Sequence, residues 1–263
     1  MKVEGKVVVV TGGADGIGRA LARRFHRENA RTVAVVDLNA AGAAAVAAET
    51  GGASYECDVS DDSALRRVIE DVEERFGPIA LFCSNAGIAA GFDLTSDNAA
   101  FAADEVWNRS WAVNVMAHVH AARILVPRMR ARGGGYFLNT ASAAGLLSQV
   151  GGAVYATTKH AAIGFAENLA ISHRADGIKV SVLCPQGVDT PMLRSLPAGP
   201  QSSDGVLSPD DVADAAIRGL ADERFLILPH PEVATYMRNK VTDYDRWIGG
   251  MAKLQRAFRE PAA

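Results

Sequence analysis

The stretch that decides the fold is VVVVTGGADGIG, residues 7–18. Its valines form a short apolar run of strand-forming residues, which Thr11 and two glycines end at once. Apolar residues at helical spacing follow, from Ala20 to Phe25. Strand, glycine-rich turn and helix in this order predict a dinucleotide site, because glycines let a pyrophosphate approach the amides at a helix N-terminus. A flexible loop is the alternative, since the T-G-x-x-x-G-x-G spacing differs from G-x-G-x-x-G.

A second apolar run, residues 32–36, ends at an acidic side chain, Asp37. It lies about twenty residues beyond the glycine turn, where a carboxylate accepts hydrogen bonds from the adenosine ribose. The same charge repels the extra phosphate of NADP, and Asp15 in the turn adds a second negative charge. We therefore predict NAD as the cofactor, preferred over NADP. The alternative role for Asp37 is that of a turn residue at a strand end.

Three polar residues farther along the chain form a proton-transfer set. Tyr155 and Lys159 are four positions apart, so on a helix they share one face. A free tyrosine has a pKa of about 10, and a neighbouring lysine charge lowers that value. The Ser142 hydroxyl would orient an alcohol or carbonyl oxygen, so the set predicts alcohol–ketone chemistry. Tyr-x-x-x-Lys alone is also typical of an exposed pair on an ordinary helix.

In their order along the chain, these motifs resemble the short-chain dehydrogenase/reductase (SDR) family, from about Lys6 to Pro229. The resemblance implies a Rossmann-like enzyme that uses a nicotinamide cofactor. It implies a catalytic set in which Asn114 anchors a water that relays the proton from Lys159 to solvent; the set is Asn114, Ser142, Tyr155 and Lys159. The implied cofactor-binding residues are Gly12, Asp15, Gly16, Ile17, Gly18, Asp37, Leu38, Asp58, Val59, Asn85, Ala86, Gly87, Tyr155, Lys159, Pro185, Val188 and Thr190.

Two positions depart from the family pattern. Ser84 stands where a first asparagine often precedes Asn-Ala-Gly, and a short polar residue there still closes the turn. Gln186 stands where glycine normally follows Pro185. A long amide beside the nicotinamide pocket is a candidate substrate contact. Val188 and Thr190 still align, and would hold the nicotinamide carboxamide.

The alternation of apolar runs and helical patterns predicts an α/β fold. We expect a doubly wound parallel sheet of about seven strands, with helices on both faces, in a single domain over residues 1–263. The predicted strands are 7–11, 32–37, 54–57, 79–84, 135–140, 179–184 and 224–228. The predicted helices are 16–29, 39–50, 61–76, 104–131, 153–175 and 208–220. Trp107 and Trp111 are expected to form one buried stripe.

The substrate pocket is expected to be mainly apolar. Alanine, leucine and valine residues surround Ser142 and Tyr155, and residues 190–208, rich in Pro, Gly and Ser, are expected to form a substrate lid. A hydrophobic secondary alcohol or its ketone is the predicted substrate. The expected substrate-binding residues are Ser142, Ala144, Gln149, Tyr155, Gln186 and Met192.

Composition limits the other function classes. The net charge is −3, so the chain lacks the basic surface of a nucleic-acid binder. No apolar run is long enough to cross a bilayer. The three cysteines have no C-x-x-C spacing and the six histidines form no cluster with them, which indicates reduced thiols in a cytoplasmic protein without a metal site.

The tail, residues 230–263, carries apolar residues at roughly helical spacing and is predicted to be a helical extension. It packs either on its own subunit or on a neighbour, and the family resemblance implies a homodimer or homotetramer.

Two other functions remain open. A non-catalytic NAD-binding regulatory protein would be expected to lack a catalytic residue, and an epimerase or dehydratase of the extended relatives would carry a larger C-terminal domain.

Overall fold

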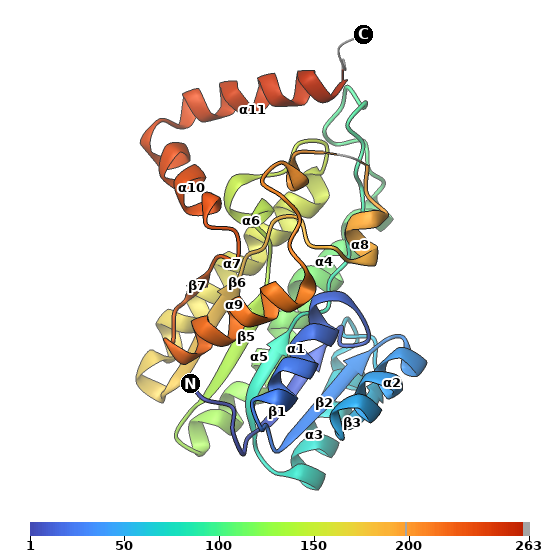
Figure 1. Cartoon of the computed structure of the whole chain (residues 1–263), viewed down its shortest axis with the longest axis vertical. Helices are drawn as coiled ribbons and strands as arrows, with labels where there is room; N and C mark the ends of the chain where they lie inside the picture. The colour runs from blue at the N-terminus through green and yellow to red at the C-terminus, as the bar shows by residue number, and fades with distance from the viewer. Residues whose placement is uncertain (198, 260–263) are drawn as a thin grey trace.

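A computed structural model, which describes residues 1–197 and 199–259, has a seven-stranded parallel sheet (Figure 1). The spatial order is β3-β2-β1-β4-β5-β6-β7, so the order reverses between β1 and β4. The doubly wound parallel sheet predicted from the sequence is confirmed. Its strands are β1 (Val7–Thr11), β2 (Thr32–Asp37), β3 (Ala53–Glu56), β4 (Ile79–Ser84), β5 (Gly135–Thr140), β6 (Ile178–Leu183) and β7 (Leu226–Ile227).

Helices cover both faces of the sheet (Figure 1). In β1, Val8 and Val10 pack into one apolar core, whereas Val7 and Val9 pack into the other, because successive strand residues point to opposite faces. The first core includes residues of α1 (Gly16–Arg27), α2 (Ala40–Thr50) and α9 (Pro209–Ala221). The second includes residues of α3 (Asp62–Phe76), α5 (Ala117–Ala131) and α7 (Ala153–His173).

The predicted helix 104–131 is interrupted. It comprises α4 (Asp104–Trp111), a π-helical turn η1 (Ala112–Met116) and α5. The predicted tryptophan stripe was wrong, because α4 turns Ser110 inward and leaves Trp111 43% exposed. The predicted helix 153–175 ends in a 3-10 turn, η2 (Arg174–Asp176). The sequence did not predict three short helices: α6 (Ala144–Leu147), α8 (Pro191–Arg194) and η3 (Pro200–Ser202).

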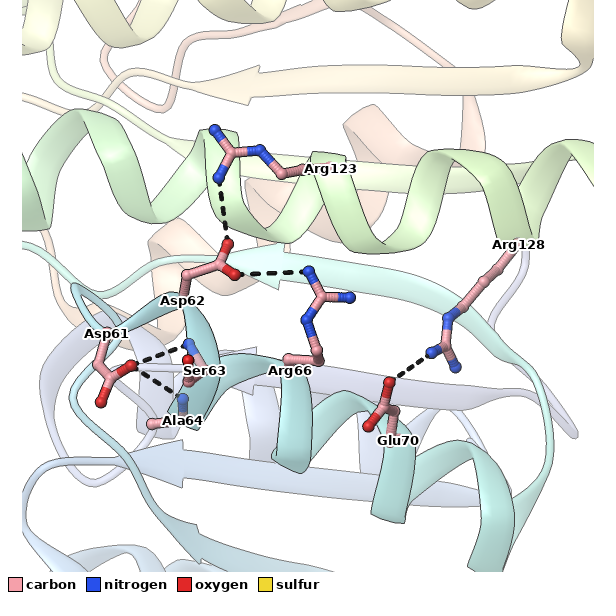
Figure 2. Close-up of polar contacts among 8 residues, drawn as sticks. All are labelled: Asp61, Asp62, Ser63, Ala64, Arg66, Glu70, Arg123 and Arg128. Carbon is pink, nitrogen blue, oxygen red and sulfur yellow. Dashed lines mark hydrogen bonds and ion pairs between the residues drawn. The ribbon is translucent and has the colours of Figure 1, made fainter.

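Polar side chains join the outer surfaces of α3 and α5 (Figure 2). Asp61 caps α3 by accepting hydrogen bonds from two backbone amides of the first turn, at 2.8 and 3.1 Å. Asp62 pairs with Arg123 at 3.3 Å, and Glu70 pairs with Arg128 at 2.9 Å. Exposed ion pairs contribute only about 0–1 kcal/mol each. The buried apolar face of α3 therefore supplies most of the energy that holds it on the sheet.

The last two helices, α10 (Glu232–Thr242) and α11 (Tyr244–Arg259), meet at the extended backbone of Asp243. In Figure 1, α11 lies across the top of the molecule. A small apolar cluster attaches the pair to the body, and its members are Ala143, Leu146, Leu147, Leu228, Val233, Tyr236, Met237 and Trp247. At the far end, Arg259 Nε donates to the carbonyl of Leu94 at 3.0 Å.

Residue 198 of the predicted lid and residues 260–263 of the predicted extension lie outside the described residues. Within the described part of the chain, none of the helices combines the length and the apolar character needed to traverse a membrane.

Candidate active site

A cavity of about 780 Å³ lies where the strands end. Gly12, Asp37, Asn85, Ser142 and Pro185 each lie at or just beyond the carboxyl end of a different strand, and all of them line it. This edge, at the point where the strand order reverses, is where doubly wound sheets bind ligands. All the expected cofactor-binding and substrate-binding residues line this one cavity; Asn114, of the expected catalytic set, does not.

The glycine turn is shaped so that no side chain fits at two of its positions. Gly12 has φ +62°, and a Cβ there would lie 2.8 Å from the Cα of Ala86. A Cβ on Gly18 would lie 1.9 Å from the carbonyl oxygen of Gly12. The Asn85 side chain holds the turn by donating to the carbonyl of Thr11 at 3.0 Å. Asn85 therefore fixes the turn as well as lining the cavity.

The start of α1 offers amides to an anion. The Asp15 carboxylate accepts a hydrogen bond from the amide of Gly16 at 2.6 Å and so caps the helix. The first-turn amides of Ile17 and Gly18 have no partner within the helix, as helix geometry requires. Both residues line the cavity, so this wall fits a phosphate group.

Asp37 lies at the end of β2 with both carboxylate oxygens turned toward backbone amides. It accepts from Ala14 at 3.0 Å and from Asn39 at 2.9 Å. A carboxylate has about four acceptor positions, which leaves room for two ribose hydroxyls. The nearby Asp58 pairs with Arg109 at 3.0 Å. Arg109 also lines the cavity, and the sequence gave no periodic or motif signal for it.

The proton-transfer set comes together on one wall. Lys159 is buried, and its Nζ lies 5.6 Å from the centroid of the Tyr155 ring. The same Nζ donates to the carbonyl of Thr140 at 3.3 Å. Burial lowers the pKa of Lys159 to about 8. Ser142 is buried too, and its Oγ accepts from the amide of Ala144 at 3.1 Å.

The structure corrects one expectation about Tyr155. Desolvation by the surrounding side chains raises the pKa of this half-buried phenol, and the nearby Ser142 hydroxyl acts in the opposite direction. The predicted net lowering is therefore not found. Four-residue spacing showed that Lys159 shares the face of Tyr155, but it contains no information on how far the phenol is desolvated.

Asn114 lies behind the cavity wall, in the π-helical turn. Its side chain exchanges two hydrogen bonds with the backbone of Ile88, both 2.9 Å long, and donates to Thr158 Oγ at 3.1 Å. A Cβ on Gly87 would lie 3.3 Å from Asn114 Oδ1 and 3.2 Å from Lys159 Nζ. Asn114 thus holds the loop after β4 against the lysine, and the predicted water relay stays a prediction.

Apolar side chains from four separate segments surround the expected substrate end of the cavity. The sequence did not predict Phe92, whose ring centroid lies 5.5 Å from that of Tyr155. It also did not show which surface the apolar face of α11 covers. The apolar lining residues are Phe92, Leu147, Val150, Met192, Leu193, Leu196, Trp247, Met251 and Leu254.

Polar contacts tie residues 190–208 to the rest of the cavity. Gln149 Nε2 donates to Gln201 Oε1 at 3.1 Å. Gln186 Nε2 donates to Asp204 Oδ2 at 3.1 Å, and the Tyr236 hydroxyl donates to Asp204 Oδ1 at 2.8 Å. Both glutamines expected to contact substrate therefore also bind this segment. Asp204 and Tyr236 line the cavity and were not predicted.

The cysteines are all buried and unpaired. Burial raises the pKa of Cys57 to about 11 and that of Cys184 to about 12. Among residues 1–197 and 199–259, no group of three or more histidine, cysteine, aspartate or glutamate side chains is arranged to hold a metal ion.

Comparisons with known proteins agree with this geometry. The family model described as short chain dehydrogenase matches residues 6–201. A 1-deoxy-11-beta-hydroxypentalenate dehydrogenase of Streptomyces exfoliatus is 33% identical, over 94% of this chain and 91% of its own. The human epidermal retinol dehydrogenase 2 is 30% identical, over 86% and 75%. Among solved structures, a short chain dehydrogenase/reductase from Burkholderia phymatum in complex with NAD has a TM-score of 0.79 and 29% identity, covering 93% of this chain and 96% of its own.

Proposed function

The chain belongs to the short-chain dehydrogenase/reductase family, and from this premise we propose that it is an NAD(H)-dependent oxidoreductase for a hydrophobic secondary alcohol and its ketone. One observation carries the proposal. Ser142, Tyr155 and Lys159 line the same cavity as the glycine turn and Asp37. A hydride carrier and a proton-transfer set would thus meet at one substrate.

The residues present fit a dinucleotide. The glycine turn forms a cradle that a Cβ at Gly12 or Gly18 would fill. Asp37 retains acceptor positions for ribose, and Val188 and Thr190 are proposed to hold the carboxamide. When bound, the nicotinamide would accept a hydride from the carbinol carbon or return one to the ketone.

The side chains of this protein handle the substrate oxygen and its proton. We expect the Ser142 hydroxyl and the Tyr155 phenol oxygen to bind that oxygen, with ionised Tyr155 as the base in oxidation. The positive charge of Lys159 favours the phenolate and so opposes the effect of burial. In ketone reduction, the Tyr155 hydroxyl returns the proton as a general acid.

A screen tests the proposal directly. The purified protein is incubated with NAD and a panel of hydrophobic secondary alcohols, and formation of the reduced cofactor is followed by its absorbance. We expect turnover of at least some apolar alcohols and of their ketones in reverse. A protein that binds NAD but oxidises none of the panel supports the alternative of a regulatory NAD-binding protein. An epimerase or dehydratase would show product formation without net cofactor reduction.

Replacing Asp37 with alanine is expected to erode the preference for NAD. The variant loses a charged acceptor for the ribose hydroxyls, and hydrogen bonds to charged groups contribute about 1.5–3 kcal/mol. We expect the NAD affinity to fall at least about tenfold, with little loss for NADP. Specificity constants for the two cofactors measure the change.

Glu56→Ala is the matched control for this substitution. Glu56 lies opposite Asp37 in the register of the neighbouring strands β2 and β3. Its side chain is exposed and does not line the cavity. Equal specificity constants for NAD and NADP in the native protein would contradict the assigned role of Asp37.

The α11 helix and residues 190–208 are proposed to close the substrate pocket, since side chains from both line it.

We also propose that the protein forms a homodimer or homotetramer in the cytoplasm. One apolar edge of the tail remains open to a neighbour, because Val241, Tyr244 and Ile248 are 75%, 55% and 56% exposed.

Light scattering of the full-length protein is expected to give a mass of two or four times 27.7 kDa. Removal of residues 243–263 is expected to lower that mass or to change the range of alcohols oxidised, because it takes away the apolar lining from α11. A monomeric full-length protein with normal turnover would remove the assembly proposal.

A further inference from the structure

Arg109 is a cation of the cavity wall that the proposed reaction does not use. It lies in α4, lines the cavity, and has a side chain that is 46% exposed. Its Nη1 donates to Asp58 Oδ2 at 3.0 Å and to Ser60 Oγ at 2.9 Å. Its Nη2 and Nε donate to no residue in the ranges 1–197 and 199–259. The guanidinium therefore has accessible donors left for a ligand in the cavity.

Asp58 is the acceptor beside these donors. Its Oδ1 accepts from the Ser60 amide at 2.9 Å and from the Ser60 hydroxyl at 2.6 Å, which holds the carboxylate in place. Partial burial acts to raise the pKa of Asp58, but the hydrogen bonds from Ser60 and Arg109 outweigh it and keep that pKa below its usual value. Asp58 is thus ionised at neutral pH. A carboxylate has about four acceptor positions, so Oδ2 retains one for a ligand.

The order of the strands places this pair where the base of a dinucleotide would lie. The glycine turn follows β1, Asp37 ends β2, and Asp58 follows β3. In the sheet, β1, β2 and β3 are successive neighbours, so each of these groups lies one strand farther from the point where the order reverses. The proposed phosphate and ribose contacts belong to the first two strands. A base attached to that ribose would extend toward the third.

An acceptor next to a donor matches the edge of adenine. The amino group at C6 of adenine donates, and the ring nitrogen on either side of it, N1 or N7, accepts. Guanine carries an oxygen at C6, and this oxygen would meet the Asp58 carboxylate without donating to it. The pair of Asp58 and Arg109 therefore favours adenine.

The charges of the cavity also favour a cation at this position. Asp15, Asp37 and Asp58 all line the cavity, and its described cationic lining residues are Arg109 and Lys159. Lys159 lies at the proposed reaction site, whereas a dinucleotide brings negative phosphates to the glycine turn. Arg109 thus offsets part of the repulsion between the three carboxylates and the phosphates.

Given the proposed function, on which this rests, we propose that Arg109 is a cofactor-binding residue that recognises the adenine base of NAD together with Asp58. The Asp58 carboxylate accepts from the amino group at C6, and a free donor of Arg109 bonds to N1 or N7. The family resemblance implies Asp58 at this end of the cavity, and Arg109 adds a second hydrogen bond to the base. This contact is separate from the choice between NAD and NADP, which we assign to Asp37.

Ring-modified cofactors test this. In 1-deaza-NAD and 7-deaza-NAD, a C–H group replaces one ring nitrogen and accepts no hydrogen bond. Calorimetry gives the dissociation constants of NAD and of both analogues without any turnover. We expect the native protein to bind one analogue about tenfold more weakly than NAD, which corresponds to one net hydrogen bond. In Arg109→Met, the NAD affinity is expected to fall about tenfold, and the difference between NAD and that analogue is expected to disappear.

Arg123→Met is the matched control. Arg123 also pairs with an aspartate, Asp62, at 3.3 Å, but it does not line the cavity. This variant is expected to bind all three dinucleotides as the native protein does, and circular dichroism checks the fold of both variants. A uniform loss of affinity in Arg109→Met, with no difference among the dinucleotides in the native protein, would indicate a charge effect alone and overturns the inference.

The remaining outcomes separate this inference from the proposed function. A difference between NAD and the analogue that persists in Arg109→Met overturns the inference. Turnover of alcohols together with equal binding of all three dinucleotides overturns it and leaves the proposed function standing. The expected calorimetric pattern without turnover of any alcohol supports the inference and contradicts the proposed function. Absence of NAD binding by the native protein overturns both.

Discussion

Tyr155→Phe is expected to lower kcat by about 10²–10⁴, the usual contribution of general acid–base catalysis. The substitution removes the proton-carrying hydroxyl and keeps the ring. Packing against Phe92, whose ring centroid lies 5.5 Å away, should persist. NADH binding, measured by fluorescence, is therefore expected to stay close to that of the native protein, whereas steady-state turnover of the best alcohol collapses.

Tyr244→Phe provides the control for loss of a phenol. Tyr244 lies in α11 and is 55% exposed, so its hydroxyl is expected to matter little. If the folded Tyr155→Phe variant turns over within tenfold of the native rate, a group other than Tyr155 transfers the proton. Lys159→Ala should weaken both turnover and cofactor binding, which separates its role from that of Tyr155.

Gly18→Ala is expected to abolish dinucleotide binding and to destabilise the fold. The added Cβ would lie 1.9 Å from the carbonyl oxygen of Gly12 and 2.7 Å from Asn85 Nδ2. Both contacts involve groups that shape the glycine turn, so the turn must move. Overpacking of this kind costs about 1–3 kcal/mol of stability. Calorimetric titration with NAD and thermal unfolding measure the two effects.

Gly249→Ala is the control for adding a methyl group. Nothing lies within 4 Å of the position its Cβ would take, and alanine is the better helix former by about 1 kcal/mol. This variant is expected to bind NAD normally and to be at least as stable. Native NAD affinity in Gly18→Ala would show that the turn does not hold the dinucleotide.

Much of the sheet could be predicted from local signals. The β1 valines, the glycine turn and Asp37 each depend on residues close in sequence, and parallel pairing then follows from the alternation with helices. The same signals indicated the lining residues that lie at strand ends, such as Gly12 and Asp37, because strand ends in a parallel sheet meet at one edge. The predicted bounds of short elements such as β7 were less accurate, since two residues form no periodic pattern.

The remaining features depend on contacts between distant segments. Gln186, Asp204 and Tyr236 come from three separate segments, and no spacing in the sequence links them. The pKa of Tyr155 depends on how completely its surroundings exclude water, which a four-residue spacing does not show. The π-helical turn at Asn114 likewise coincides with hydrogen bonds to Ile88 in the loop after β4, a contact between distant segments that helix propensity does not show.

The attachment of α10 and α11 affects how such a protein diverges during evolution. These helices contribute no strand to the sheet, and through Val233 they join a small cluster that touches one of the large cores only through the partly buried Leu146 and Leu228. We therefore expect mutations in α11 to reshape the cavity at little cost to folding, whereas mutations in β1 or its glycine turn are expected to disturb the core. On the proposed function, a lineage would be expected to change its substrate by altering this terminal segment while the cofactor site stays the same.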